Sequence, residues 1–156
     1  MKICLLCVGR LSIGYLREGA ADFEARLQRY LPVRIVELKE EKSGKNDAEY
    51  IRRQEGRRIL EKIPAGSFVI ALDERGRSVS SEKLAALLER HMMESTPELT
   101  LIIGGAYGLC DEVKQRADML MSLSEMTLTH QMARLVLLEQ LYRGFTIVRN
   151  EPYHNR

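Results

Sequence analysis

The sequence lacks any apolar run of the roughly 20 residues that a membrane-spanning helix needs. Its apolar start, residues 2–8, is short for a secretory signal peptide and leads into Gly9 and Arg10 without a small-residue cleavage pattern. We therefore expect a cytoplasmic protein with no membrane partner.

Cysteine is scarce, with only Cys4, Cys7 and Cys110 in the chain. The first two have the C-x-x-C spacing of metal and redox sites. They fall, however, within a predicted strand, where residues three apart point to opposite faces and cannot easily share one ion. No second pair of Cys or His completes a zinc site. We interpret both residues as small buried hydrophobic side chains and expect no metal.

An excess of one charge is also missing, because 24 Lys and Arg stand against 22 Asp and Glu, a formal net charge of +2. Proteins dedicated to binding duplex nucleic acid are usually more basic, so charge alone gives only a weak indication of an RNA partner. The G-x-G-x-x-G dinucleotide motif and the P-loop motif are absent as well, which gives NAD and ATP little support.

What the sequence does contain is a regular alternation of apolar runs and amphipathic stretches, the pattern of an α/β protein. We predict strands at residues 2–8, 34–38, 68–72, 99–103 and 119–123. Helices are predicted at residues 13–30, from the capping-box-like Asn46 and Glu49 to about 62, after Ser80 or Ser81, from Asp111, and at 130–146. Two of the strands are apolar at nearly every position, as in a parallel sheet covered on both faces. A single domain over residues 1–156 follows, with a mostly parallel sheet flanked by helices.

The last predicted helix is apolar around most of its circumference, whereas a surface helix would show one apolar stripe. Such a helix must be covered on several sides, by its own domain and by a second copy of the chain. We therefore expect a homodimer with a mostly hydrophobic interface, and we expect Leu138 and Leu141 to contribute to it.

Three segments lie directly after predicted strands: Leu72 with Asp73, residues 104–108, and residues 123–128. Ligands of open α/β sheets bind beyond the carboxyl ends of the strands, so these three segments can build one pocket. The glycines of residues 104–108 would let the backbone approach a ligand closely. A plain strand-to-helix turn is the alternative interpretation of that glycine segment.

Taken in order, the segments LIIGGAYGL (101–109), LSEMTL (123–128), LYRGF (141–145) and PYH (152–154) resemble the RlmH family of the SPOUT methyltransferases. The resemblance covers essentially the whole chain. It implies a SPOUT-type fold with a C-terminal trefoil knot, and methylation of N3 of a pseudouridine in 23S rRNA with S-adenosylmethionine as cofactor. The cofactor-binding positions it implies are Leu72, Gly104, Leu123, Ser124, Glu125, Met126, Thr127 and Leu128.

The chain departs from the family at Thr129, where the family usually has a proline before the histidine of the last helix. Threonine is a good residue for the N-terminal cap of a helix, so the helix can still begin there. The substitution bears on how rigid the cofactor loop is, and we do not expect it to abolish binding.

Methylation of an imide nitrogen needs its proton removed, or the resulting anion stabilised by a positive group. We expect His154 in the tail to reach the target base, Tyr153 to stack on it, and Arg143 to hold a phosphate or the developing anion. Each has a plainer interpretation as an exposed tail residue or a paired charge. His130 and Arg134 are expected near the cofactor loop.

A cluster of basic residues, Arg52, Arg53, Arg57 and Arg58, lies on one predicted helix. It is either a solvated face with internal ion pairs or a surface that contacts phosphates. Because the net charge is small, we expect the enzyme to recognise the assembled ribosome and to methylate a bare RNA stem-loop poorly.

Two other functions stay open at this point. A Rossmann-like nucleotide-dependent enzyme would use the glycine loop at 104–108, with Glu37 or Glu40 holding a ribose. A non-catalytic protein that binds RNA or the ribosome could have the same fold and make no use of a cofactor.

Overall fold

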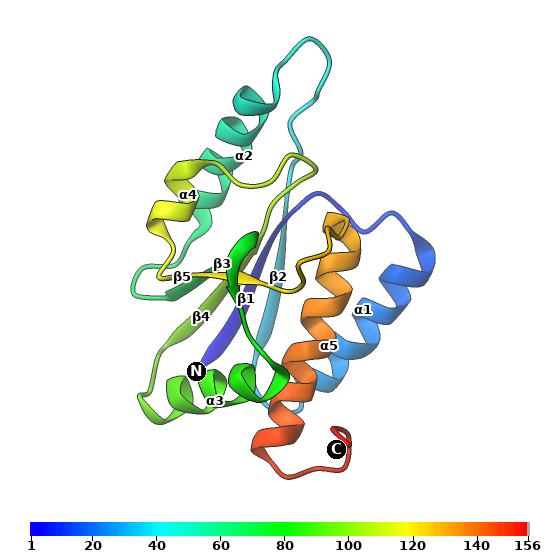
Figure 1. The fold of residues 1–156 in the computed structure, drawn as a ribbon, viewed down its shortest axis with the longest axis vertical. Coiled ribbons are helices and arrows are strands. Elements are labelled where there is room, and N and C mark those ends of the chain that lie inside the picture. Colours follow the sequence, from blue (N-terminus) through cyan, green and yellow to red (C-terminus); the bar gives the residue numbers. More distant parts are fainter. Residues whose placement is uncertain (156) are drawn as a thin grey trace.

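A computed structural model describes residues 1–155 of the chain, in which five strands alternate with five helices (Figure 1). The strands are β1 (Lys2–Val8), β2 (Val33–Leu38), β3 (Phe68–Ser78), β4 (Glu98–Ile103) and β5 (Met119–Ser122). The helices are α1 (Gly14–Leu27), α2 (Ala48–Lys62), α3 (Ser81–Met93), α4 (Asp111–Arg116) and α5 (His130–Val148). All strand pairs are parallel, in the order β2-β1-β4-β3-β5, which confirms the α/β fold class.

Helices cover both faces of the sheet, and the alternation of side chains along β1 shows how the two cores form. Leu5 and Cys7 point into the core under α1, α3 and α5, whereas Cys4 and Leu6 point into the core under α2 and α4. The two cysteines therefore lie on opposite faces, as the strand period requires. Burial raises the pKa of the Cys4 thiol to about 11 and that of Cys7 to about 12, so both stay protonated at neutral pH.

Side chains of the expected kind cap three of the helices. Ser80 accepts a hydrogen bond from the Lys83 N–H at 3.2 Å, as predicted for α3. At α2 the cap is Asp47, one residue after the predicted Asn46, and it accepts from the Tyr50 N–H at 2.7 Å. Thr129 caps α5 in place of the family's proline.

β3 continues six residues beyond the predicted end at 72, because its second half contacts β5. Met121 in β5 pairs with both Leu72 and Arg77 of β3, across a break in the register. Gly76 lies against the backbone of β5, since a Cβ at Gly76 would be 2.7 Å from the Leu120 carbonyl carbon and from the Met121 nitrogen. Figure 1 shows this end of β3 passing across β5. The trefoil knot that the family resemblance implies stays a prediction.

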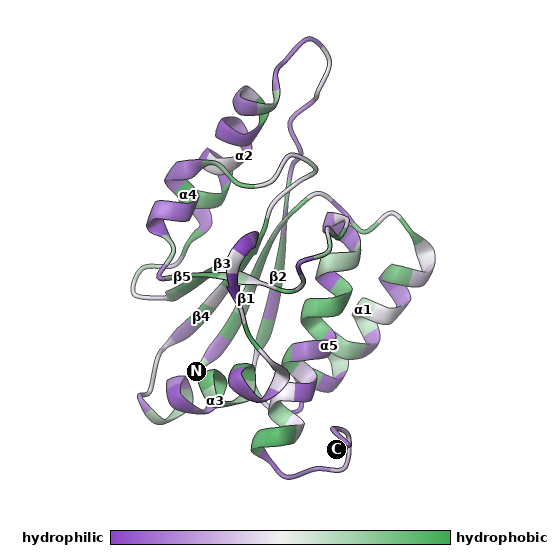
Figure 2. Ribbon diagram, viewed as in Figure 1, coloured by the Kyte–Doolittle hydropathy of each residue, from purple (hydrophilic) through white to green (hydrophobic). Residues whose placement is uncertain are grey.

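Helix α5 is apolar over much of its length (Figure 2), but the sequence-based assignment of its faces needs one correction. Leu138 and Leu141 are completely buried within the core of their own chain, so placing them in a dimer interface was wrong. Another side of the helix carries the half-exposed apolar residues Met132, Val136 and Ile147. Of the helices described, none is both long and apolar enough to span a bilayer.

Candidate active site

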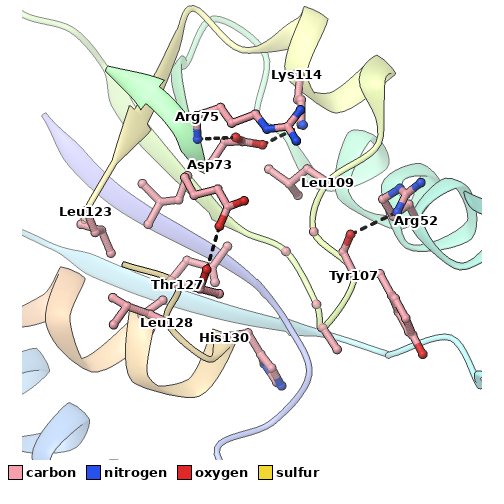
Figure 3. Close-up of a pocket in the computed structure, with 18 of the residues that line it drawn as sticks. Arg52, Asp73, Arg75, Tyr107, Leu109, Lys114, Leu123, Thr127, Leu128 and His130 are labelled. Atoms are coloured by element: carbon pink, nitrogen blue, oxygen red, sulfur yellow. Dashed lines mark hydrogen bonds and ion pairs between the residues drawn. The ribbon is translucent and has the colours of Figure 1, made fainter. Parts of the chain in front are cut away.

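A cavity of about 680 Å³ opens beside the middle of β3, at residues 72–75, and at the carboxyl ends of β4 and β5. This part of β3, the loops after β4 and β5, and the first turn of α5 form its walls, as Figure 3 shows. The three segments that the sequence analysis singled out thus meet in one pocket. Its volume is within the range of roughly 300–1,000 Å³ that small-molecule and cofactor sites occupy.

The structure brings together seven of the eight residues predicted to bind the cofactor. The seven that line the cavity are Leu72, Gly104, Leu123, Ser124, Met126, Thr127 and Leu128. The eighth, Glu125, is exposed and is not among the lining residues. Because these seven residues line the cavity, they can contact a ligand there, and their role in binding the cofactor stays a prediction.

The glycine segment after β4 is a tight turn that forms a wall with few side chains. The Gly108 N–H donates to the Gly105 carbonyl at 3.1 Å, and Gly108 has a φ of +80°, which glycine adopts at little cost. A Cβ at Gly104 would lie 2.9 Å from Leu109 Cδ2 and 3.0 Å from the Gly108 carbonyl carbon. A side chain at Gly104 would therefore push the turn out of shape and change the pocket.

An ion pair fixes the middle of β3 to α4, the helix after the glycine turn. Asp73 accepts from Lys114 Nζ at 2.7 Å and from the Arg75 N–H at 2.8 Å (Figure 3). Partial burial alone would raise the pKa of the Asp73 carboxyl, but these two contacts outweigh it and the pKa lies below its usual value. Asp73 is therefore charged at neutral pH, and these two contacts hold its side chain in place in the pocket wall.

The segment 123–128 is held by hydrogen bonds of its own and by one bond across the pocket. Ser124 Oγ accepts from the Met126 N–H at 2.9 Å, and Ser122 donates to the Ser124 carbonyl at 2.9 Å. Across the cavity, Thr127 Oγ1 donates to Glu74 Oε2 at 3.0 Å, as drawn in Figure 3. The second half of β3 and the loop after β5 are thus linked over the pocket.

The three residues predicted for catalysis lie together at the other end of α5. Arg143 pairs with Glu139, its guanidinium carbon is 4.7 Å from the ring centre of Tyr153, and its Nη1 is 3.3 Å from His154 Nδ1. Because arginine only donates, Nδ1 accepts, and the opposite ring nitrogen donates to Glu82 Oε1 at 3.0 Å.

Tyr153 completes this cluster. Its hydroxyl donates to Glu139 Oε1 at 3.0 Å, and the edge of its ring meets Tyr142 with the ring centres 4.6 Å apart. Burial and then the bond to Glu139 raise the pKa of Tyr153, so its hydroxyl stays protonated at neutral pH. We call Glu82, Glu139, Arg143, Tyr153 and His154 the tail cluster.

The tail cluster and the pocket are separated by most of α5. His130, in the first turn, lines the pocket, and Arg143 follows 13 residues later. At a rise of 1.5 Å per residue, these two positions are about 20 Å apart along the helix axis. Within one chain, the tail cluster cannot act on a ligand in the pocket.

The basic cluster on α2 is largely engaged in contacts within the chain. Arg53 pairs with Glu49 at 2.8 Å, and Arg58 pairs with Glu41 and donates to the Lys39 carbonyl at 2.9 Å. Arg52 differs from them, because it lines the pocket and donates to the Tyr107 carbonyl at 3.4 Å. Whether the cluster contacts RNA stays a prediction.

Sequence reasoning selected Asp73 together with Leu72, because both lie at the end of a predicted buried strand, but it did not select Glu74 and Lys114, which also shape the site. Glu74 and Lys114 carried no comparable signal, since each depends on which loop lies opposite.

The match to a protein family covers nearly the whole chain. A family described as "Predicted SPOUT methyltransferase" matches residues 1–154. Proteins called "Ribosomal RNA large subunit methyltransferase H" are similar throughout. The one from Geobacter sulfurreducens is 45% identical and aligns over 99% of this chain and all of its own. The one from Pelotomaculum thermopropionicum is 46% identical over 97% of this chain and 98% of its own.

Two solved structures have a similar fold at low sequence identity. A probable methylase family protein from Haemophilus influenzae superposes with a TM-score of 0.53 at 15% identity, over 99% of this chain and 70% of its own. A putative methylase family protein from Neisseria gonorrhoeae gives a TM-score of 0.53 at 14% identity, over 99% of this chain and 85% of its own. At such low sequence identities, the similarity supports the fold alone.

Proposed function

This chain belongs to the SPOUT methyltransferase family, and we propose that it transfers a methyl group from S-adenosylmethionine to N3 of a pseudouridine in 23S rRNA. It acts as a homodimer on the ribosome in the cytoplasm. The observation that carries the proposal is the pocket formed where residues 72–75 of β3 meet the loops after β4 and β5. The near full-length similarity to proteins named as large-subunit rRNA methyltransferases supports the choice of RNA.

The residues of the pocket fit a nucleoside with an amino-acid arm. Leu72, Leu123 and Leu128 offer apolar contacts for a flat base, and the glycine turn at 104–108 offers backbone that a ligand can approach closely. S-adenosylmethionine, when bound, supplies an activated methyl group on a sulfonium. The chain's own contribution is to hold the donor in line with the acceptor, which is the main requirement of such a displacement.

The tail cluster supplies the chemistry on the acceptor side. Arg143 stabilises the negative charge that develops on the imide, and Tyr153 stacks on the target base. His154 Nδ1 is the unprotonated nitrogen of the imidazole, because the other ring nitrogen donates to Glu82 and Nδ1 accepts from Arg143. In this proposal His154 accepts the N3 proton once the base displaces Arg143 from Nδ1.

A homodimer resolves the separation of about 20 Å between the pocket and the tail cluster. The half-exposed residues Met132, Val136 and Ile147 lie on the same side of α5 as Arg143, at helical spacings of four and seven. In a two-fold dimer the same patch meets itself. Two antiparallel copies of α5 joined by this patch bring the tail of one protomer toward the pocket of its partner.

The first test is transfer of labelled methyl from S-adenosylmethionine to ribosomes from a strain that lacks this modification. We expect label in the 23S rRNA, and N3-methylpseudouridine after digestion and mass spectrometry. The bare stem-loop should be a much poorer substrate than the ribosome. Binding to ribosomes without any transfer of label would instead indicate a non-catalytic ribosome-binding protein.

A further inference from the structure

The first two turns of α5 are joined to the ends of β1 and β2 by a seam of polar contacts around the buried side chain of Arg134. Arg134, whose side chain is 4% exposed, donates from Nη1 to Glu37 Oε2 and from Nη2 to the Gly9 carbonyl, both at 2.8 Å. Glu37 Oε2 also accepts from the Leu11 N–H at 3.2 Å. These contacts join residues that are 97 and 125 positions apart in the sequence.

A second side chain of α5, that of Gln131, contacts the segment that follows β1. Gln131 Oε1 accepts from the N–H groups of Ser12 and Ile13 at 3.0 and 3.2 Å, and Gln131 Nε2 donates to Ser12 Oγ at 2.9 Å. His130 Nε2 lies 3.6 Å from Glu40 Oε1. Glu37 and Glu40, the two acids that could have held a ribose in a Rossmann-like enzyme, are therefore both in contact with α5.

The seam sits directly below the pocket. His130 and Ala133 line the cavity, and Arg134 is the next residue of the helix. The segment 123–128 enters this turn through Thr129, whose hydroxyl accepts from the Met132 N–H. The downstream end of the segment 123–128 is therefore fixed to the sheet through Arg134 and Gln131.

We propose that Arg134, held by Glu37 and the Gly9 carbonyl, is a positioning residue that sets the donor-binding geometry of the segment 123–128. This inference rests on the proposed function, because the donor is the ligand whose affinity it controls. Arg134 is buried beneath the pocket wall and acts through the backbone of α5. Without Glu37 as the partner of Arg134, the first turn of α5 and the segment 123–128 ahead of it can move relative to the glycine turn at 104–108.

The test uses a matched pair of substitutions on two ion pairs of β2. Glu37→Ala removes the partner of Arg134 at the pocket end of the strand. The control, Glu98→Ala, removes the partner of Arg34, an ion pair of 3.1 Å that joins β2 and β4 at the opposite end of the sheet. Both lose one ion pair, but only the first lies beneath the pocket.

We expect Glu37→Ala to raise the KM for S-adenosylmethionine about 5-fold or more, with kcat at saturating donor near that of the wild type. Glu37→Gln, which keeps an acceptor for Arg134, should restore most of the KM, and Glu98→Ala should leave the KM unchanged. Without any ligand, hydrogen exchange at residues 123–128 should be faster in Glu37→Ala and unaltered in Glu98→Ala.

An unchanged KM together with unchanged exchange at residues 123–128 in Glu37→Ala would overturn the inference. Equal effects of Glu37→Ala and Glu98→Ala would overturn it too, because they would reflect stability alone. If the wild type bound no S-adenosylmethionine while Glu37→Ala still exchanged faster at residues 123–128, the proposed function would fail and the positioning role would stand.

Discussion

The two ends of helix α5 are built in different ways. At its N-terminal end lies the pocket, where backbone segments approach each other closely at Gly104 in the pocket wall and at Gly76 just beyond the lining residues of β3. At its C-terminal end, the side chains of the tail cluster make a network of charge and hydrogen bonds. The pocket end is suited to holding a ligand in a fixed place, and the tail end is suited to handling charge and protons.

This difference predicts how each end responds to substitution. At the pocket end, adding a single methyl group is disruptive because backbone atoms lie where it would go. At the tail end, the fold does not depend on such contacts, and removing a charge should change the reaction more than the stability.

The largest effect is expected on the buried side of α5, between the two ends. Leu141→Asp places a carboxylate in the chain's own core and should cost about 5 kcal/mol or more, enough to unfold the protein. Val136→Asp, on the half-exposed side, should leave a folded monomer. Circular dichroism and analytical ultracentrifugation of the two variants separate these outcomes. A folded, dimeric Val136→Asp protein would contradict the interface proposed here.

Next is the crossing of β3 over β5. Gly76→Ala puts a methyl group 2.7 Å from backbone atoms of Leu120 and Met121, which cannot move as a side-chain end could. We expect a loss of about 3 kcal/mol in the free energy of unfolding, measured by urea denaturation. Gly66→Ala is less suitable as a control because Gly66 has a φ of +74°, whereas Gly14→Ala, with no atom within 4 Å of the added carbon and an ordinary φ, should be nearly neutral.

At the tail end, Arg143→Met should reduce kcat about 100-fold, because the positive charge that stabilises the imide anion is lost. Binding of S-adenosylmethionine, measured by calorimetry, should be unchanged, because Arg143 is not among the residues that line the pocket and acts on the acceptor base in this proposal. As a control, Arg26→Met removes a charge that lies over the Tyr142 ring, outside the tail cluster, and should leave kcat unaltered. Weaker donor binding in Arg143→Met would show that the tail cluster also contributes to binding the donor.

The smallest effect concerns pH and a histidine far from both the pocket and the tail cluster. Burial lowers the pKa of His91, and the positive Arg90 lowers it further, while Glu94 and Asp118 oppose the shift. As the pH falls below the ordinary value of about 6.5, the unfolded chain takes up the proton before the folded chain does, so stability is lost.

His91→Phe should remove this part of the pH dependence, whose slope cannot exceed about 1.4 kcal/mol per pH unit for one proton. The measurement is urea denaturation of both proteins between pH 7.5 and pH 5. Donor affinity should be the same in both proteins at each pH. Identical pH slopes in the two proteins would contradict the buried, neutral state of His91.

The sequence was informative about the pocket because the three predicted strands end at Leu72, Ile103 and Leu123, which line the cavity. It was less informative about β3, since residues 73–78 are mostly polar and pair with β5 at Arg77 and Ser78, beyond a break in the register. The contact between Glu37 and Arg134 was out of reach, because it joins positions 97 residues apart with no local pattern.

The interface assignment failed for a physical reason as well. An apolar helix in a sequence shows that it is covered, but not which residues its own chain covers, and Leu138 and Leu141 turned out to be core. The separation of His154 and Arg143 from the pocket was, in contrast, available from the sequence. The offset of 13 residues from His130 to Arg143 in the predicted helix already implied a separation of about 20 Å along its axis.

The central claim is that the pocket of one protomer works with the tail cluster of its partner. Mixed dimers of Gly104→Ala, with a distorted pocket, and His154→Ala, with an incomplete tail cluster, test it directly in the methyl transfer assay. Each variant alone should be inactive, and co-expressed chains should recover about a quarter of wild-type activity, because half of the dimers would hold one intact pair. No recovery in dimers shown to be mixed would contradict the account.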